Sequence, residues 1–110
     1  MHTINGNNIA LTRGDTLYIT ISIFKNGEPY VPVEGDVIRF AMKAKYKDPD
    51  EKILILKDIP TDTLLLKIEP EDTKELPFAK TYVYDIQLTN DEGDVDTFII
   101  GTFTITEEVY

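Results

Sequence analysis

Few side chains in this chain of 110 residues could perform chemistry, and their spacing does not assemble a catalytic group. His2 is the one histidine and lies beside the N-terminus, while Ser22 is the one serine and lacks the Gly-x-Ser-x-Gly pattern of a nucleophile. A Ser/His/Asp arrangement is therefore excluded, and the absence of cysteine excludes disulfides and thiolate ligands. Paired carboxylates could cleave glycosidic bonds, but they need a cleft that so short a chain has little sequence to build. We expect no enzymatic activity.

Acidic side chains gather in two segments, and calcium prefers several oxygen ligands of this kind. The clusters are Asp91, Glu92, Asp94 and Asp96 in one segment and Asp48, Asp50 and Glu51 in the other. Neither follows the twelve-residue EF-hand pattern, which begins Asp-x-Asp-x-Asp and ends with glutamate. We favour solvated loops over calcium sites, and we expect no cofactor.

Charge and hydropathy limit the partners of the chain. The net charge is −9; residues 1–46 hold five basic and four acidic side chains, whereas residues 47–110 hold six basic and sixteen acidic ones. An acidic surface repels phosphate backbones, so we expect no nucleic-acid partner and interpret the acidic half as a solvated surface. Residues 1–6 lack the features of a signal peptide, and the longest aliphatic run, residues 53–56, is too short to span a bilayer. We expect synthesis in the cytoplasm without a signal peptide and no membrane insertion.

Alternating apolar and polar residues predict strands, most clearly over residues 81–89. Tyr82, Tyr84, Ile86 and Leu88 recur there at every second position, which is the period of a strand with one buried face. Further strands are expected at residues 9–11, 17–24, 37–44, 53–59, 64–68 and 95–106. Residues 70–76 predict one helical turn, because proline suits the start of a helix and acidic residues follow it. No other helix is expected, and residues 46–52 are predicted to form a loop.

Turn residues connect these strands. Asn26-Gly27 between two apolar runs predicts a hairpin, since a type I′ turn needs positive φ at both central residues. Residues 90–94 predict a second hairpin before the last strand. In that strand the apolar residues stand at even positions before Gly101 (Phe98, Ile100) and at odd positions after it (Phe103, Ile105). Two alternatives follow: a β-bulge at Gly101, or a straight strand with Ile99, Phe103 and Ile105 inward and Phe98 and Ile100 on the outer face.

Seven to eight short antiparallel strands in a chain of this length predict a single domain, residues 1–110, in which two sheets form a β-sandwich. We expect its core to contain Ile19, Ile21, Ile38, Phe40, Tyr82, Tyr84, Ile86 and Leu88. Residues 70–82 resemble the approach to the F strand of an immunoglobulin-type sandwich, where a tyrosine hydroxyl pins the corner.

Five motifs, in their order and spacing, carry a resemblance to a known family. They are Arg13-Gly14-Asp15-Thr16, Gly35-Asp36-Val37-Ile38-Arg39-Phe40-Ala41, Pro70-Glu71-Asp72-Thr73, Tyr82-Val83-Tyr84-Asp85-Ile86-Gln87-Leu88 and Gly93-Asp94-Val95-Asp96-Thr97. The chain from Ile9 to Val109 resembles the immunoglobulin-like N-terminal domain of phage baseplate upper proteins and related prophage-encoded proteins of Gram-positive bacteria. The resemblance implies an immunoglobulin-like fold and a virion structural module that docks onto other tail and baseplate proteins.

One outer face is the candidate surface for contact with a partner. Its outward residues are expected to be Arg39, Ala41, Lys43, Val83, Asp85 and Gln87. Small apolar side chains mixed with charges suit an interface that must also be soluble alone, and an ordinary solvated face is the alternative. If the two strands are neighbours, Arg39 and Asp85 are expected to pair across them. Because a tail baseplate is built from many copies, the resemblance also favours a homo-oligomer or a weak self-contact.

A second hypothesis is a cell-surface adhesion or carbohydrate-binding β-sandwich. Tyr18, Phe24 and Tyr30 could stack on sugar rings in such a protein. Covering a neighbouring strand or edge is the simpler role for these rings, so we favour association with other proteins.

Overall fold

The computed structural model describes residues 2–77 and 80–108, most of which lie in strands. The strands are β1 (His2–Asn5), β2 (Asn8–Thr12), β3 (Leu17–Thr20), β4 (Phe24–Lys25), β5 (Glu28–Pro29), β6 (Val37–Lys43), β7 (Ile55–Ile59), β8 (Leu65–Ile68), β9 (Lys80–Thr89) and β10 (Val95–Thr106). Two short helices accompany them, η1 (Asp50–Lys52) and α1 (Pro70–Lys74). The prediction of an all-β protein is confirmed, but these described segments contain ten strands where seven to eight were expected.

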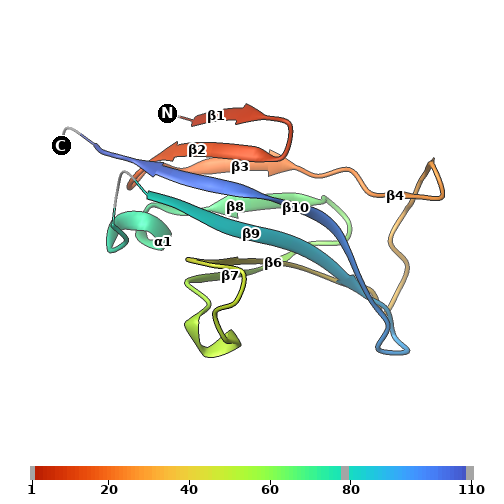
Figure 1. Ribbon diagram of the computed structural model, residues 1–110. Helices are drawn as coiled ribbons and strands as arrows, with labels where there is room; N and C mark the ends of the chain where they lie inside the picture. The colour runs from red at the N-terminus through yellow and green to blue at the C-terminus, as the bar shows by residue number, and fades with distance from the viewer. Residues whose placement is uncertain (1, 78–79, 109–110) are drawn as a thin grey trace.

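Six strands form one large sheet in the order β1-β2-β10-β9-β6-β7. This sheet curls like half of a barrel, and its strands run across the molecule in Figure 1. Neighbouring strands are antiparallel except β2 and β10, which are parallel, with Ile9 beside Phe103 and Thr12 beside Thr106. The expectation of antiparallel pairing throughout is therefore wrong at this pair, because no hairpin joins β2 to β10 and dictates their relative direction.

The remaining strands form two small sheets, β3–β8 and β4–β5. Leu17 of β3 faces Ile68 of β8, and both belong to the same buried cluster as Phe40 and Tyr82 of the large sheet. The strand expected at residues 17–24 is divided, because β3 ends at Thr20 and the β4–β5 hairpin projects from the side of the molecule (Figure 1). The described residues therefore form three sheets where two were expected.

One hydrophobic cluster joins the large sheet to β3 and β8. Of the eight residues predicted for the core, seven are buried, and Ile19 packs against them while partly exposed. The ring of Phe40 lies 5.2 Å from that of Tyr84 and 6.4 Å from that of Phe103, measured between centroids. Period-two alternation therefore identified the buried face of β6 and β9 correctly.

Two of the hairpins have two-residue turns. Asn26 and Gly27 have φ of 53° and 78°, so the type I′ hairpin predicted between β4 and β5 is confirmed. A second tight turn at Gly6, with φ of 63°, joins β1 to β2. Glycine at the first central position suits a type II′ turn, and this hairpin adds a strand that the apolar pattern did not indicate.

The irregularity of β10 lies at Phe98 and not at Gly101. Pairing with β9 shifts its register between Thr97 and Ile99, so the bulge expected at Gly101 is wrong. The alternative correctly placed Ile99, Phe103 and Ile105 inward and Ile100 outward, but the strand is not straight and Phe98 is not on the outer face. Phe98 and Ile99 both pack against the core, while Ile100 remains exposed. The extra residue at Phe98 changes which parity of β10 faces inward.

Gly101 is needed because other atoms approach its backbone closely. A Cβ at this position would overlap the carbonyl oxygen of Asn7 and lie 2.9 Å from a ring carbon of Tyr84. These two neighbours are themselves joined, since the Tyr84 hydroxyl donates a hydrogen bond to that carbonyl at 2.6 Å. The β1–β2 turn therefore packs directly over β10.

Helix α1 confirms the helical turn expected at residues 70–76. A capping box forms its start: the Asp72 carboxylate accepts the Glu69 N–H at 2.7 Å, and the Glu69 side chain accepts the N–H of Asp72. Thr73 is fully buried, and its hydroxyl accepts the N–H of Gly14 at 2.8 Å. Two of the five sequence motifs, around Gly14 and around Asp72, therefore contact each other.

An ion pair ties the end of β10 to α1 and to the turn after β2. The Nη2 of Arg13 lies 2.7 Å from Oε1 of Glu108, and Nζ of Lys74 lies 3.3 Å from Oε2. The Nη1 of Arg13 also donates to the carbonyl oxygen of Leu76 at 3.2 Å. Hydrogen bonds from Arg13 are the main cause that lowers the pKa of Glu108 to about 2, and Lys74 adds to the effect. The carboxylate stays ionised and holds the three segments together.

Candidate functional site

The six residues predicted to contact a partner lie side by side, because β6 and β9 are neighbours in the large sheet. Their register forms three facing pairs, namely Arg39 with Gln87, Ala41 with Asp85 and Lys43 with Val83. The residues between them on both strands are buried, so all six point to the outer face of the sheet.

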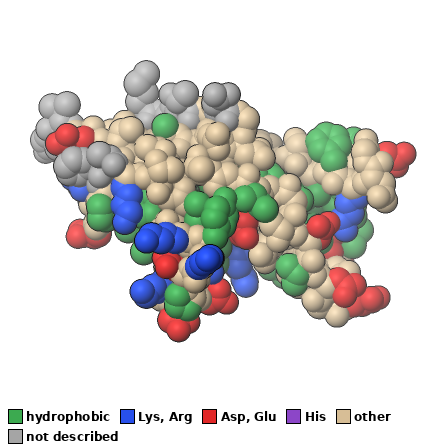
Figure 2. Space-filling view, viewed as in Figure 1, with side chains coloured by type: hydrophobic (Ala, Val, Ile, Leu, Met, Phe, Trp, Pro, Cys, Tyr) green, Lys and Arg blue, Asp and Glu red, His purple; other side chains and the backbone are tan. Residues whose placement is uncertain are grey.

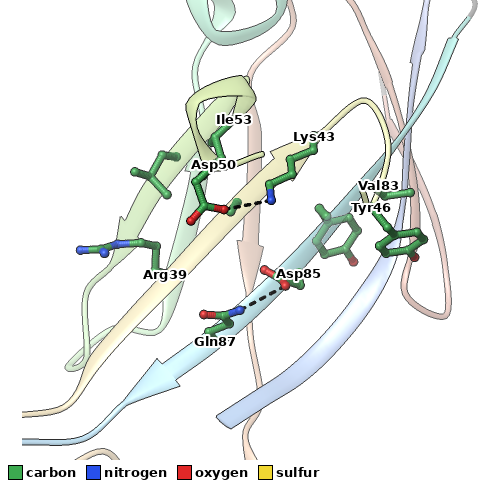
Figure 3. A pocket seen from close by; sticks show the side chains of 11 residues that line it. Arg39, Lys43, Tyr46, Asp50, Ile53, Val83, Asp85 and Gln87 are labelled. Atoms are coloured by element: carbon green, nitrogen blue, oxygen red, sulfur yellow. Dashed lines mark hydrogen bonds and ion pairs between the residues drawn. The ribbon is translucent and has the colours of Figure 1, made fainter. Parts of the chain in front are cut away.

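These side chains line an open hollow of about 310 Å³ on the outer face (Figure 3). Five further residues complete its lining. Tyr84 belongs to β9, and Tyr46, Asp50, Ile53 and Leu56 come from β7 or from the connection that leads to it. This connection extends from the lower side of the large sheet in Figure 1. Sequence reasoning missed Ile53 and Leu56, since the continuous apolar run at 53–59 shows no period that would assign its faces. The pairing of Leu56 with Ala41 places β7 and its connection beside the outer face of β6.

Lys43 fixes the connection between β6 and β7 beside the hollow. Its Nζ lies 3.1 Å from Oδ1 of Asp50 and donates to the carbonyl oxygen of Asp48 at 3.0 Å. Asp50 begins η1, a helical turn that the sequence did not predict, and the expectation of no helix other than residues 70–76 is wrong here. The turn is closed by backbone hydrogen bonds, from the N–H of Lys52 to the carbonyl of Pro49 and from the N–H of Ile53 to that of Asp50.

The predicted ion pair between Arg39 and Asp85 is wrong, although both side chains lie on the outer face. Arg39 pairs instead with Asp58 of β7, with 2.9 Å between Nε and Oδ1. The register explains this choice, because Asp58 lies directly opposite Arg39 whereas Asp85 lies opposite Ala41. Arg39 points away from Asp85 in Figure 3. Both members of the pair that forms are more than half exposed, so it adds about 0–1 kcal/mol to stability.

Asp85 differs from the other charged groups of the hollow. Its carboxylate accepts a hydrogen bond from Nε2 of Gln87 at 3.3 Å. Within residues 2–77 and 80–108, no lysine or arginine forms an ion pair with it. Arg39 and Lys43, by contrast, each have an aspartate partner. The hollow therefore contains one carboxylate whose charge is not balanced by a neighbour in the described chain.

Apolar side chains are exposed around this charged centre. Leu56 is 53% exposed and Tyr46 is 64% exposed, and Ile100 of β10, opposite Asp85, is 54% exposed. Figure 2 shows hydrophobic side chains near the middle of the visible face, with charged side chains around and below them. Exposed apolar side chains that gather beside charged groups favour contact with another molecule.

The aromatic residues of the carbohydrate hypothesis do not form one uniform surface. Tyr18 is exposed on β3, with Nζ of Lys67 5.4 Å from its ring centroid. Phe24 is exposed on the β4–β5 hairpin, whereas Tyr30 is half-buried and its hydroxyl donates to Asp36 at 2.6 Å. That hydrogen bond is the main cause that lowers the pKa of Asp36. Tyr30 therefore has a structural role in fixing the segment before β6.

The acidic segments differ in what they contact. Asn90 organises the β9–β10 turn, because its Oδ1 accepts the N–H groups of Glu92 and Asp94 at 3.0 and 2.9 Å. Asp50 of the other cluster pairs with Lys43. Across the described residues, no three acidic or histidine side chains come together in a way that could hold a metal ion.

The lining of the hollow combines charged, amide and apolar side chains. None of its lining residues is serine, threonine, cysteine or histidine. What it offers is one unbalanced carboxylate, two neutralised cations, an amide and apolar walls. These groups can hold a complementary surface through charge, hydrogen bonds and burial.

In the part of the chain that the structure describes, no helix has both the length and the apolar character needed to cross a membrane. The chain matches no protein-family model, and neither the curated proteins nor the solved structures contain a match to it.

Proposed function

We propose that this protein is a non-enzymatic structural module of a phage or prophage virion, which binds other tail or baseplate proteins. The observation that carries the association function is the hollow on the outer face, where three facing residue pairs of β6 and β9 meet the walls from β7. The virion setting comes from the resemblance of the five sequence motifs. In this proposal the chain is made in the cytoplasm and resides in the tail baseplate.

We also propose that the fold is an immunoglobulin-like sandwich. The neighbours β7-β6-β9-β10 would take the places of strands C′, C, F and G, and the pair β3–β8 those of B and E. The hydroxyl of Tyr82, near the start of β9, donates to the carbonyl oxygen of Pro77 at 3.0 Å. A tyrosine near the start of strand F that bonds to backbone a few residues upstream is typical of immunoglobulin-like domains. Both observations support the proposal.

The test of the virion role is the composition of tails from the source bacterium. Tails are purified from a lysate after prophage induction, and mass spectrometry measures the copies of this chain per tail. We expect several copies per particle, because baseplates are symmetric assemblies. Purified tails that lack the chain would contradict the proposal. Binding to a glycan array by a chain absent from tails would favour the adhesion alternative.

A variant tests whether the hollow is the contact surface. Val83→Lys adds a charge beside Lys43, and we expect it to weaken incorporation into tails strongly. Thr20→Lys adds the same charge at an exposed position of β3 and serves as the matched control. Light scattering over a concentration series measures whether the wild type self-associates and whether Val83→Lys abolishes this. Equal incorporation of both variants would exclude the hollow as the interface.

A further inference from the structure

The charged side chains inside the hollow are unequally paired. Arg39 and Lys43 are neutralised by Asp58 and Asp50, at 2.9 and 3.1 Å. Asp85 has no cationic partner within residues 2–77 and 80–108, and the amide of Gln87 is its hydrogen-bond donor there. Charge-assisted hydrogen bonds are stronger than those between neutral groups. The Asp85 carboxylate can therefore still accept a hydrogen bond from a cation.

The walls around Asp85 suit the aliphatic part of a long basic side chain. Val83, Ile53 and Leu56 supply apolar surface, and the Tyr46 ring is exposed at the rim. Lysine and arginine bury their methylene groups along such surfaces while the charged head remains in a polar contact. An aromatic face also attracts a cation. The hollow, of about 310 Å³, is open to solvent, so a side chain of another protein can enter it.

The charge of the whole chain favours a basic partner over a second copy of this protein. The net charge is −9, and residues 47–110 hold sixteen acidic against six basic side chains. Two copies would therefore bring like charges together, whereas a basic segment would be attracted to this surface before contact.

We propose that the hollow binds a lysine or arginine side chain, presented by an extended segment of a basic partner protein with apolar residues on either side. The cation lies against Asp85 and Gln87, and the methylene groups lie against Val83 and Leu56. This inference rests on the association function proposed above and adds the chemistry of the partner.

A series of short peptides tests the inference without the natural partner. The peptides are acetyl-Gly-Val-X-Val-Gly-amide, where X is arginine, lysine, citrulline, leucine or glutamate. Each is titrated into ¹⁵N-labelled protein at about 0.15 M salt, where long-range attraction between exposed charges is largely screened. We expect saturable shifts of the amides of Ala41, Val83 and Asp85 with arginine and lysine. Citrulline keeps the shape of arginine without its charge, and we expect roughly three- to tenfold weaker binding.

Two variants assign the effect to one carboxylate. Asp85→Asn removes the charge in the hollow, and Asp91→Asn makes the same change at the exposed β9–β10 turn. We expect the first to weaken the arginine peptide roughly three- to tenfold and to leave the citrulline peptide unchanged, and the second to alter neither. The ¹⁵N spectrum of each free variant shows whether the fold is kept.

Several outcomes would overturn the inference. They are equal binding of the arginine and citrulline peptides, tightest binding of the glutamate peptide, shifts spread over other acidic surfaces, or equal effects of both variants. Concentration-dependent shifts of the same three amides without peptide would identify a second copy as the occupant and would also overturn it. If tails contain the chain but these peptides do not bind the hollow, the virion proposal stands and this inference fails. If the peptides bind as expected but tails lack the chain, this inference stands and the virion proposal fails.

Discussion

The substitution Gly101→Ala tests the packing of the β1–β2 turn over the large sheet. An added methyl group would overlap the carbonyl oxygen of Asn7 and lie 2.9 Å from the Tyr84 ring. The obstacle is backbone and cannot rotate away, so the turn at Asn7 has to move. That movement would break the hydrogen bond of 2.6 Å from the Tyr84 hydroxyl to the same carbonyl.

The magnitude follows from three contributions. Overpacking of a tight site costs about 1–3 kcal/mol, and the lost hydrogen bond costs about 1 kcal/mol. Alanine is better than glycine in a strand by about 0.5–1 kcal/mol, which offsets part of this loss. We therefore expect Gly101→Ala to lower the free energy of unfolding by about 2 kcal/mol, which corresponds to a fall in Tm of roughly 10 °C for a domain of this size.

Urea denaturation followed by far-UV circular dichroism measures this change, and tyrosine fluorescence provides a second probe because the chain has no tryptophan. The control is a double-mutant cycle with Tyr84→Phe, which removes the hydroxyl and keeps the ring. Tyr84→Phe alone should cost about 1 kcal/mol, and it should cost less in the Gly101→Ala background, where the bond is already broken. Wild-type stability of Gly101→Ala, or strict additivity of the two changes, would refute the reasoning.

Three further predictions concern other parts of the fold. The pKa of Glu108 is about 2, below the usual value near 4.5, so its pairing with Arg13 stabilises the fold fully above pH 4.5 and is lost as the pH falls towards 2. Glu108→Gln should therefore flatten the pH dependence of the urea midpoint between pH 5 and pH 2. Tyr82→Phe removes the hydrogen bond to Pro77 and should cost about 1 kcal/mol by urea denaturation, and an unchanged midpoint would show that the corner does not depend on it. Phe40→Ala leaves a cavity in the fully buried core and should cost about 3–5 kcal/mol by the same assay, with a loss below about 1 kcal/mol contradicting its central place.

Much of the fold could be predicted from local pattern, because alternation and turn chemistry act over a few residues. The period of two in β6 and β9 places Phe40 and Tyr84 in the core, and Asn26-Gly27 forms the expected turn. Residues on one face of a strand share that face whatever strand lies beside it. For this reason the six contact residues could be assigned to one surface before their neighbours were known.

Lateral pairing could not be predicted in the same way, because it depends on register between strands that are distant in sequence. Arg39 and Asp85 share a face, but the register places Asp58 directly beside Arg39. Likewise, the apolar residues of β10 change from even to odd positions, which shows that the strand is irregular but not where. The structure places the extra residue at Phe98. The walls of the hollow were missed for the same physical reason, since they come from a neighbouring strand and its connection.

The parallel pairing of β2 with β10 has a mechanical consequence. Four register pairs, from Ile9 with Phe103 to Thr12 with Thr106, join the two strands, and the N–H of Arg13 adds a bond of 2.9 Å to the carbonyl of Thr106. Tension between Asn8 and Glu108 would pull these strands in opposite directions along their axes. The bonds between them would then be loaded together in shear, whereas an antiparallel pair pulled at one end opens one bond at a time. Once β1 has peeled away, the domain would extend little until the whole β2–β10 contact gives way.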